Sequence, residues 1–233
     1  MGFSTLNEWL EFQQGINPKE IDLSLDRVQT LYNKLQINIP KKNVFLIGGT
    51  NGKGTTTSIL EQLFHKKGYK TGAFTSPHLT QYNERVRINL NNSFDQDWVS
   101  AFEIIEAVRG DVSLTYFEFS TLAAFQILSN HDCDAWFIEV GLGGRLDATN
   151  IIESSVSVLT SIAMDHEEWL GDSIDKIAKE KVGIAKRNRP LIFGDVVAVD
   201  VIQAGSLEKG AELRKKGEDF NGRIDQGYYS FNG

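Results

Sequence analysis

A short apolar segment, residues 43–47, runs directly into a glycine-rich stretch that begins at Gly48. Beyond this stretch, residues 54–67 carry apolar side chains at helical spacing and stop before Gly68, a residue type that commonly ends a helix. The apolar face of that helix comprises Ile59, Leu60, Leu63 and Phe64. Residues 70–75 indicate another strand. Strand, glycine loop, helix and strand in this order predict a βαβ unit, which normally belongs to a parallel sheet.

The glycine-rich stretch, residues 48–57, has the features of a phosphate-binding loop. Glycines let successive N–H groups point toward phosphate oxygens, and the following helix adds its positive N-terminal end. Its match to the pattern G-x-x-x-x-G-K-[ST] is imperfect, because Ile47 and Gly54 occupy two of the defining positions. An ordinary glycine-rich turn with an incidental Lys53 is the alternative interpretation. We expect ATP to bind Gly49, Thr50, Asn51, Gly52, Lys53, Gly54 and Thr55.

The alternation of helices and strands continues along most of the chain. Further helices are expected at residues 5–14, 24–36, 98–108, 118–130 and 173–186, and further strands at 135–140, 156–162 and 190–194. The pattern weakens after about residue 203, although the last six residues indicate a strand and a turn. These features predict an α/β fold of the P-loop NTPase type, with a mostly parallel sheet flanked by helices.

Composition narrows the class of protein. The chain has 233 residues with 31 acidic and 24 basic side chains, and its net charge of −7 disfavours nucleic acid as a partner. Cys133 is the single cysteine, so an intramolecular disulfide is impossible and a reducing compartment is expected. No apolar run is long enough to span a membrane, and the N-terminus lacks the pattern of a secretory signal. We therefore expect a cytoplasmic protein without a membrane partner.

Glu139 lies next to the last residue of the expected strand at 135–140. An open α/β sheet presents ligand-binding residues at the carboxyl ends of its strands. A carboxylate there is well placed to hold Mg²⁺, a hard cation that prefers oxygen ligands and phosphate. A capping or salt-bridged glutamate is the alternative, and the residue alone favours that alternative.

Several segments resemble the Mur ligase superfamily, and within it the folylpolyglutamate synthase and dihydrofolate synthase branch. They are GTNGKGT at residues 49–55, SPHL at 76–79 with ERVR at 84–87, EVGLGGRLDATN at 139–150, TSI and DH within 160–166, and EKVGI at 180–184. The resemblance covers about residues 20–230. It implies that residues 1–233 form an N-terminal, ATP-binding domain of the Mur ligase central type, cut short and lacking the C-terminal ligase domain.

The resemblance also implies an activity. The family forms an amide from ATP, a carboxylate and an amine through an acyl phosphate. For this branch the amine is L-glutamate and the acceptor is dihydropteroate or a folate, in folate biosynthesis and polyglutamylation. A monomer is expected.

Metal ligands and catalytic groups follow by the same resemblance. Ser76 holds the position of a hydroxyl ligand to Mg²⁺, with Thr75 as the fallback, and Glu139 and His166 complete the expected ligands of two Mg²⁺ sites. Lys181 occupies the position of a lysine that the family carbamoylates, a modification that requires a neutral amine and hence a lowered pKa. We expect catalytic roles for Lys53, Lys181 and His166. The alternative is that these residues occupy ordinary strand-end, loop or helix-surface positions and have no role in catalysis.

The expected acceptor site comprises three segments. They are Ile21, Asp22 and Leu23, then Leu114, Thr115, Tyr116 and Phe117, and finally Leu146, Asp147 and Ala148. Tyr116 and Phe117 are suited to stack on a flat heterocycle. Adjacent aromatic residues at the start of a helix are equally suited to a core, so that alternative stays open without the resemblance.

Two other functions compete with the folate branch. One is a cell-wall Mur ligase, against which the Gly54 that follows Lys53 and the LTYFE segment at residues 114–118 count. The other is a nucleotide-binding module that binds ATP without turnover. Nucleotide-dependent partner binding without phosphate release would mark such a module.

Overall fold

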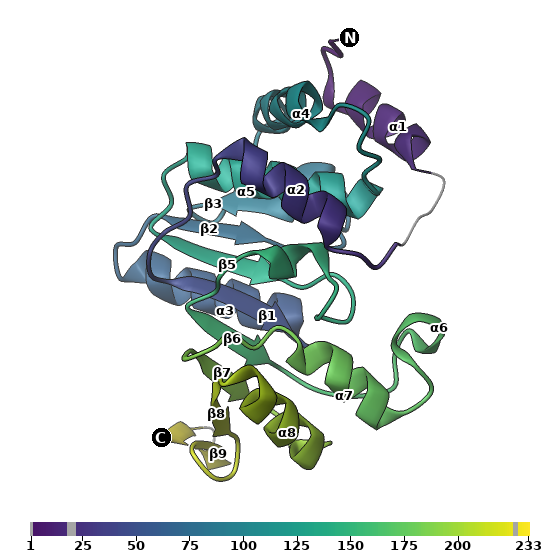
Figure 1. Ribbon diagram of the computed structural model, residues 1–233. Coiled ribbons are helices and arrows are strands. Elements are labelled where there is room, and N and C mark those ends of the chain that lie inside the picture. Colours follow the sequence, from purple (N-terminus) through teal and green to yellow (C-terminus); the bar gives the residue numbers. More distant parts are fainter. Residues whose placement is uncertain (1, 18–21, 226–227) are drawn as a thin grey trace.

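The structure is a computed structural model that describes residues 2–17, 22–225 and 228–233. Its main feature is an eight-stranded sheet in the order β4-β3-β2-β5-β1-β6-β7-β8 (Figure 1). The strands are β1 (Val44–Gly48), β2 (Thr71–Phe74), β3 (Val86–Ile88), β4 (Asn91–Asn92), β5 (Ala135–Glu139), β6 (Val156–Leu159), β7 (Pro190–Phe193) and β8 (Glu212–Lys215). Six strands from β2 to β8 pair in parallel, and β3 and β4 add an antiparallel edge. The expected mostly parallel sheet is confirmed.

Helices surround this sheet. They are α1 (Leu6–Ile16), α2 (Asp26–Leu35), α3 (Lys53–Lys66), α4 (Asp95–Arg109), α5 (Tyr116–Asn130), α6 (Glu167–Leu170), α7 (Ile174–Val182) and α8 (Val199–Lys209), with 3₁₀ turns η1 (Tyr82–Arg85) and η2 (Ala148–Ile151). In Figure 1, α1 and α4 lie beyond the β3 end of the sheet, and α7 and α8 lie toward the β8 end. A separate hairpin of β9 (Asn221–Asp225) and β10 (Tyr228–Asn232) follows. Among the described residues, no helix is long and apolar enough to cross a membrane.

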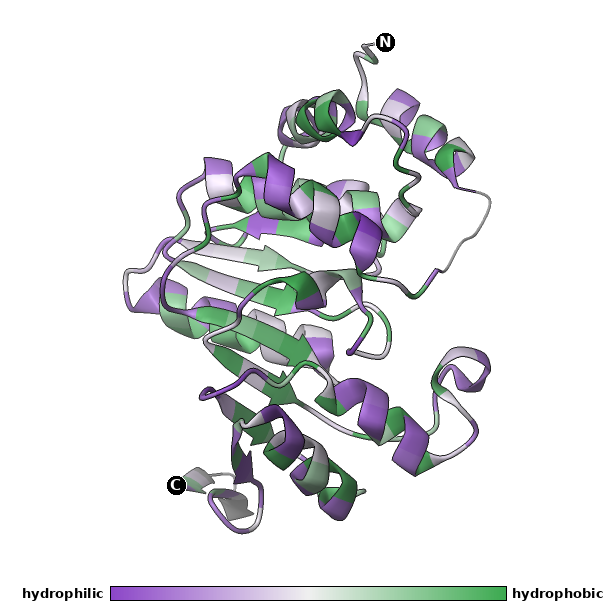
Figure 2. Cartoon of the chain, in the orientation of Figure 1, coloured by the Kyte–Doolittle hydropathy of each residue, from purple (hydrophilic) through white to green (hydrophobic). Residues whose placement is uncertain are grey.

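Alternation along β1 explains why both faces of the sheet are covered. Val44 and Leu46 are fully buried in the large core that α2, α4 and α5 also enter. Phe45 points to the other face, where its ring lies 5.2 Å from that of Phe64 on α3. Because successive side chains of a strand point to opposite faces, an unbroken apolar segment requires apolar partners on both. Figure 2 shows the corresponding concentration of hydrophobic residues along the central strands.

Several expected elements differ from the structure in their bounds or faces. Ile59 and Leu63 of α3 are 52% and 53% exposed, so the expected apolar face of that helix is only half right. The expected strand at 156–162 ends at Leu159, and the expected helix at 173–186 ends at Val182. β3, β4, α6, α8, β8 and β9 were not expected from the sequence pattern.

Candidate active site

The loops that follow β1, β2, β5 and β6 meet at one edge of the sheet. These four strands are neighbours in parallel register, so their carboxyl ends point the same way. β1 lies between β5 and β6, and the chain leaves it for α3 on one face before returning to β2. Ligands of open α/β sheets bind outside such carboxyl ends. The expected site residues on these loops are therefore brought to one edge.

The glycine-rich loop between β1 and α3 wraps around the Lys53 side chain. Gly49 and Gly52 have φ angles of +138° and +84°, a region that favours glycine. Lys53 Nζ donates to the carbonyl oxygens of Gly49 at 3.1 Å and Thr50 at 3.2 Å. Lys53 is the first residue of α3, and its side chain therefore lies along the glycine loop.

Residues after β6 hold the glycine loop in place. The Thr50 N–H donates to the Ser161 carbonyl oxygen at 2.8 Å, and the Asn51 N–H donates to Ser161 Oγ at 3.0 Å. Thr160 Oγ1 donates to the Asn51 carbonyl oxygen at 2.7 Å. A Cβ atom on Gly49 would lie 2.0 Å from Thr160 Oγ1, so only glycine fits there. These contacts between protein groups hold the glycine loop in its shape.

Glu139 at the end of β5 faces the start of α3. Its side chain is 6% exposed, and Oε2 accepts a hydrogen bond from the Ser76 N–H at 3.2 Å. A Cβ atom on Gly54 would lie 3.6 and 3.7 Å from the two carboxylate oxygens. Burial raises the pKa of Glu139, while the Ser76 N–H, Lys53 and Arg87 oppose that rise. The site therefore holds a desolvated carboxylate beside the positive end of a helix.

The register after β2 distinguishes the two candidate hydroxyl ligands. Ser76 is the residue whose backbone meets Glu139. The neighbouring Thr75 hydroxyl accepts a hydrogen bond from Arg87 Nη1 at 3.3 Å and lies 3.4 Å from the Glu84 carbonyl oxygen. Ser76 is thus the better placed of the two for a ligand at Glu139.

His166 lies in the loop after β6, immediately before α6. Its φ angle is +46°, its side chain is 55% exposed, and its Nε2 lies 3.6 Å from the Asp165 carboxylate. Within the part of the chain that the structure describes, no three His, Cys, Asp or Glu side chains form a group that could hold a metal ion. The structure therefore brings the Ser76 backbone against Glu139, and the charged partner that it gives His166 is Asp165.

Lys181 on α7 reaches the same carbonyl oxygen of the glycine loop as Lys53. The side chain is 2% exposed, and Nζ donates to the Gly49 carbonyl oxygen at 3.0 Å. Burial, and after it the positive charge of Lys53, lower the pKa of Lys181 to about 8. Asp165 and Asp147 act in the opposite direction. The environment that a neutral amine requires is present at this residue.

A cavity of about 240 Å³ adjoins the Ser76 loop. Seven of the expected acceptor residues line it, namely Asp22, Leu23, Thr115, Phe117, Leu146, Asp147 and Ala148. Leu114 is fully buried in the core instead, and the Tyr116 ring packs against Tyr82 at 6.1 Å between centroids. Neither Leu114 nor Tyr116 is among the residues that line the cavity. Ile21 lies outside the described residues.

Sequence reasoning did not propose the remaining residues of the cavity wall. Ser24, Pro77, Arg85, Glu118, Gly141 and Leu142 also line it, together with Ser76, which was proposed only as a metal ligand. Signals existed for all of them except Ser24, because Pro77, Gly141 and Leu142 also lie in segments that carry the family resemblance. Arg85 belongs to the ERVR segment, and Glu118 follows Thr115 by three residues, the spacing of a capping box.

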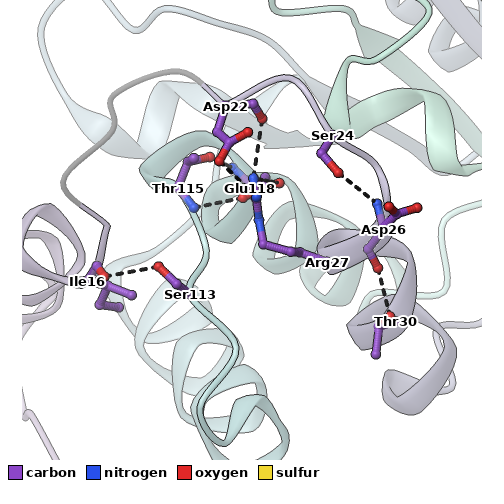
Figure 3. A network of polar contacts seen from close by, with 9 residues as sticks. All are labelled: Ile16, Asp22, Ser24, Asp26, Arg27, Thr30, Ser113, Thr115 and Glu118. Carbon is purple, nitrogen blue, oxygen red and sulfur yellow. Dashed lines mark hydrogen bonds and ion pairs between the residues drawn. The ribbon is translucent and has the colours of Figure 1, made fainter.

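The capping box at the start of α5 anchors one wall of the cavity (Figure 3). Glu118 Oε2 accepts from the Thr115 N–H at 2.7 Å, and Thr115 Oγ1 accepts from the Glu118 N–H at 3.2 Å. The other oxygen of Glu118 pairs with Arg27 at 3.0 Å, and Arg27 pairs with Asp22 at 2.9 Å. This chain of contacts fixes Asp22, from the segment before α2, against α5.

Asp147 shapes the loop on the other side of the cavity. Its carboxylate accepts hydrogen bonds from the Leu142 N–H at 2.7 Å and the Thr149 N–H at 2.9 Å. Burial raises the pKa of Asp147, and these N–H groups oppose the rise. The buried carboxylate therefore holds residues 141–147 folded beside the Phe117 ring.

Comparison with known proteins identifies relatives along nearly the whole chain. The dihydrofolate synthase/folylpolyglutamate synthase of Escherichia coli strain K12 is 42% identical over 228 residues, which are 98% of this chain and 54% of that protein. The folylpolyglutamate synthase of Lacticaseibacillus casei is 33% identical over 204 residues, 84% of this chain and 48% of that protein. The chain spans about half the length of the curated relatives it matches.

Solved structures agree with these relatives. E. coli FolC in complex with DHPP and ADP superposes with a TM-score of 0.96 at 41% identity, covering 98% of this chain and 55% of that one. The bifunctional folylpolyglutamate synthase/dihydrofolate synthase of Yersinia pestis, complexed with AMPPNP and a Mn ion, has a TM-score of 0.93 at 39% identity, covering 98% and 56%. The family model of the Mur ligase middle domain matches residues 47–204. Because that match covers more than half of the sequence, this chain belongs to the Mur ligase middle domain family.

Proposed function

We propose that this chain carries the ATP site and the acceptor site of an ATP-dependent amide ligase that adds L-glutamate to dihydropteroate or folates. One observation carries the proposal. Ser76 lines the acceptor cavity, and its backbone N–H donates to the carboxylate of Glu139, which faces the start of α3. The cavity and the glycine loop are therefore adjacent compartments of one site, as a reaction between a carboxylate and ATP requires.

ATP fits the loop between β1 and α3. The loop supplies backbone N–H groups, the helix supplies its positive end, and Lys53 supplies a positive charge for the outer phosphates. Gly49, Thr50, Asn51, Gly52, Gly54 and Thr55 are the proposed contacts beside Lys53. The relatives from E. coli and Y. pestis contain ADP and AMPPNP, which supports a nucleotide at the corresponding loop here.

Mg²⁺ fits beside Glu139. Proteins bind this ion through one or two carboxylates together with substrate phosphates, so a single buried carboxylate is a sufficient protein contribution. The absence of a side chain on Gly54 leaves space next to both Glu139 oxygens. We propose Ser76 and Glu139 as ligands, with His166 contributing to a second ion. The metal would neutralise charge on the phosphates during phosphoryl transfer.

The acceptor fits the cavity. Phe117 offers a flat apolar ring, and Leu23, Leu146 and Ala148 add apolar wall. Asp22, Thr115 and Asp147 supply polar edges for a heterocycle that carries hydrogen-bonding nitrogens. The E. coli relative contains DHPP, which supports a pterin acceptor for this cavity.

The proposed reaction has two steps. The acceptor carboxylate attacks the γ-phosphorus of ATP and forms an acyl phosphate. The phosphoanhydride bond between the β- and γ-phosphates breaks, and ADP leaves. The amino group of L-glutamate then attacks the acyl carbon, loses a proton and displaces phosphate. Lys53 and the loop N–H groups stabilise charge in the first step. Lys181, in a carbamoylated form, would become an anion beside the same loop.

The wider setting is also proposed here. We expect residues 1–233 to act as one ATP-binding domain, as a monomer in the cytoplasm, without nucleic acid or a membrane as partner. The net charge of −7 and the lone Cys133 support these expectations.

Formation of ADP tests the function. The chain is incubated with MgATP, dihydropteroate and L-glutamate, and with each substrate withheld in turn. We expect ADP formation to require dihydropteroate and its continued turnover to require L-glutamate. ADP formation that is indifferent to the acceptor, or that responds to a cell-wall peptide precursor instead, would contradict the proposal. ATP binding without any acceptor-dependent ADP would identify a nucleotide-binding module without turnover.

A further inference from the structure

Arg85 is a cavity residue that the proposed function leaves without a role. It ends the 3₁₀ turn η1 and lines the acceptor cavity, although only 8% of the residue is exposed. The Thr75 N–H donates to the Arg85 carbonyl oxygen at 2.8 Å. Arg85 is therefore attached to the end of β2, directly beside Ser76.

The guanidinium group is held by neutral partners. Its Nε donates to His78 Nδ1 at 2.9 Å, and its central carbon lies 5.1 Å from the centroid of the Tyr82 ring and 5.7 Å from that of Tyr116. These contacts fix the plane of the guanidinium and leave its charge uncompensated.

Among the described residues, no carboxylate pairs with Arg85. The arginines at positions 27, 87, 109 and 145 each pair with a glutamate or an aspartate. The neighbouring Glu84 is not available, because its carboxylate accepts from the N–H groups of Leu79 at 2.7 Å and Gln81 at 2.9 Å. Arg85 is thus a buried cation whose acidic neighbour in the sequence is already engaged.

The acids of the cavity wall are engaged as well. Asp22 and Glu118 pair with Arg27, and Asp147 accepts from the backbone of its own loop. A guanidinium stays charged in proteins, and burying it without an anion is costly. The terminal nitrogens of Arg85 have no protein acceptor among the described residues, so the cavity is the place from which an anion can compensate the charge.

We propose that Arg85 binds the carboxylate of the acceptor substrate and directs it toward Ser76 and the glycine loop. The inference rests on the proposed function, and it assigns the charged end of the acceptor to one residue. The heterocycle end belongs to Phe117 and Asp147, so the carboxylate extends along the cavity toward the Ser76 side, where ATP would react. A planar guanidinium with a fixed orientation matches a carboxylate in geometry and charge.

A pair of ligands that differ only at this group tests the inference. Pteroate and its carboxamide share the heterocycle and the benzoyl ring, but only pteroate carries the negative charge. We expect the unaltered chain to bind pteroate about 10- to 100-fold more tightly than the carboxamide, the range for a charge-assisted hydrogen bond. In Arg85→Gln, this preference should vanish while the affinity for the carboxamide stays within about threefold.

Arg214→Gln is the matched control. It removes the same charge from an exposed position on β8, outside the residues that line the cavity, and should keep the full preference for pteroate. Arg85→Lys keeps the positive charge without the planar fork, so part of the preference should remain. If Arg85→Gln also binds the carboxamide more weakly, the Arg85→Lys variant decides the question. A reduced preference of Arg85→Lys for pteroate over the carboxamide then supports the inference.

Two results would contradict the inference, and they are distinguishable. An undiminished preference for pteroate in Arg85→Gln, or in the Arg85→Lys variant where that one decides, overturns the role of Arg85 and leaves the proposed function intact. Failure of the unaltered chain to bind either pterin ligand overturns the proposed function, and the inference falls with it.

Discussion

Single residues at this edge of the sheet are best understood through their neighbours. Phe117 and Tyr116 are adjacent in the sequence, yet Phe117 lines the cavity and Tyr116 packs against Tyr82. The sequence indicates two aromatic residues at a helix start, but the choice between them depends on which direction the first turn of α5 faces. Arg85 shows the same limitation, because its isolation from acids depends on residues elsewhere in the chain.

Lys181 gives the clearest pH dependence of the fold. Its pKa of about 8 lies below the usual lysine value, so the unfolded chain binds more protons at this site between about pH 8 and 10. The free energy of unfolding should therefore rise with pH across that window. Relative to Lys181→Met, the unaltered chain should gain about 2 kcal/mol from pH 8 to 10, as measured by urea unfolding. A constant difference between the two chains would show that the lysine is not desolvated.

Gly54 tests the metal position. Alanine at this helical position places a methyl group in ordinary contact with both Glu139 oxygens, at 3.6 and 3.7 Å. The helix tolerates alanine well, so the fold should persist with stability changed by no more than about 1 kcal/mol. We expect Gly54→Ala to weaken binding of MgATP but not of metal-free ATP, as seen by calorimetry with and without a chelator. Equal affinity for MgATP in the unaltered chain and in Gly54→Ala would show that the metal does not bind beside Glu139.

At the scale of elements, the βαβ unit was predictable because its signals are local. The apolar segment, the glycines and the helical spacing all lie within residues 43–75, and the structure has β1, α3 and β2 there. α8 carried no such signal. A Cβ atom on Gly205 of α8 would lie 2.4 Å from Val182 on α7. The close packing of these two helices therefore requires glycine at this position, although glycine is a weak helix former. The antiparallel strands β3 and β4 are too short for periodicity to reveal.

The expected strand at residues 156–162 is also instructive. Its last residues leave the sheet, and the side chains of Thr160 and Ser161 hydrogen-bond the glycine loop instead. Their apolar neighbours are compatible with a longer strand, so the sequence pattern did not separate the two outcomes. The segment acts as a clamp between β6 and the loop after β1.

This clamp has a measurable consequence. Thr160→Val removes the hydroxyl that donates to the Asn51 carbonyl oxygen and keeps the shape of the side chain. A net hydrogen bond contributes about 1 kcal/mol, so ATP should bind about fivefold more weakly to the variant. Thr160→Ser keeps the hydroxyl and should retain most of the affinity. Equal weakening in both variants would indicate that packing, and not the hydrogen bond, matters at this position.

At the scale of the whole molecule, both proposed ligands belong to one sheet edge but to different helices. The glycine loop leads into α3 on one face, and the cavity lies against the start of α5, which packs on the other. The glycine-loop residues were expected from one contiguous motif, whereas the three separate acceptor segments were expected from the family resemblance. The resemblance placed Ser76 with Glu139 as metal ligands, but it did not predict that Ser76 also lines the acceptor cavity.

The central claim is that ATP and the acceptor occupy separate, adjacent sites on this chain. The most direct measurement is a calorimetric titration with Mg-AMPPNP and with pteroate, on the unaltered chain and two variants. The affinity of Lys53→Ala for Mg-AMPPNP should fall about 10- to 100-fold, because the variant removes a charged contact from the glycine loop alone. Its affinity for pteroate should be unchanged. The affinity of Phe117→Leu for pteroate should fall by up to about 10-fold, because the variant removes only the flat ring. Its affinity for Mg-AMPPNP should be unchanged. Loss of both ligands in either variant, or of neither in both, would contradict the account.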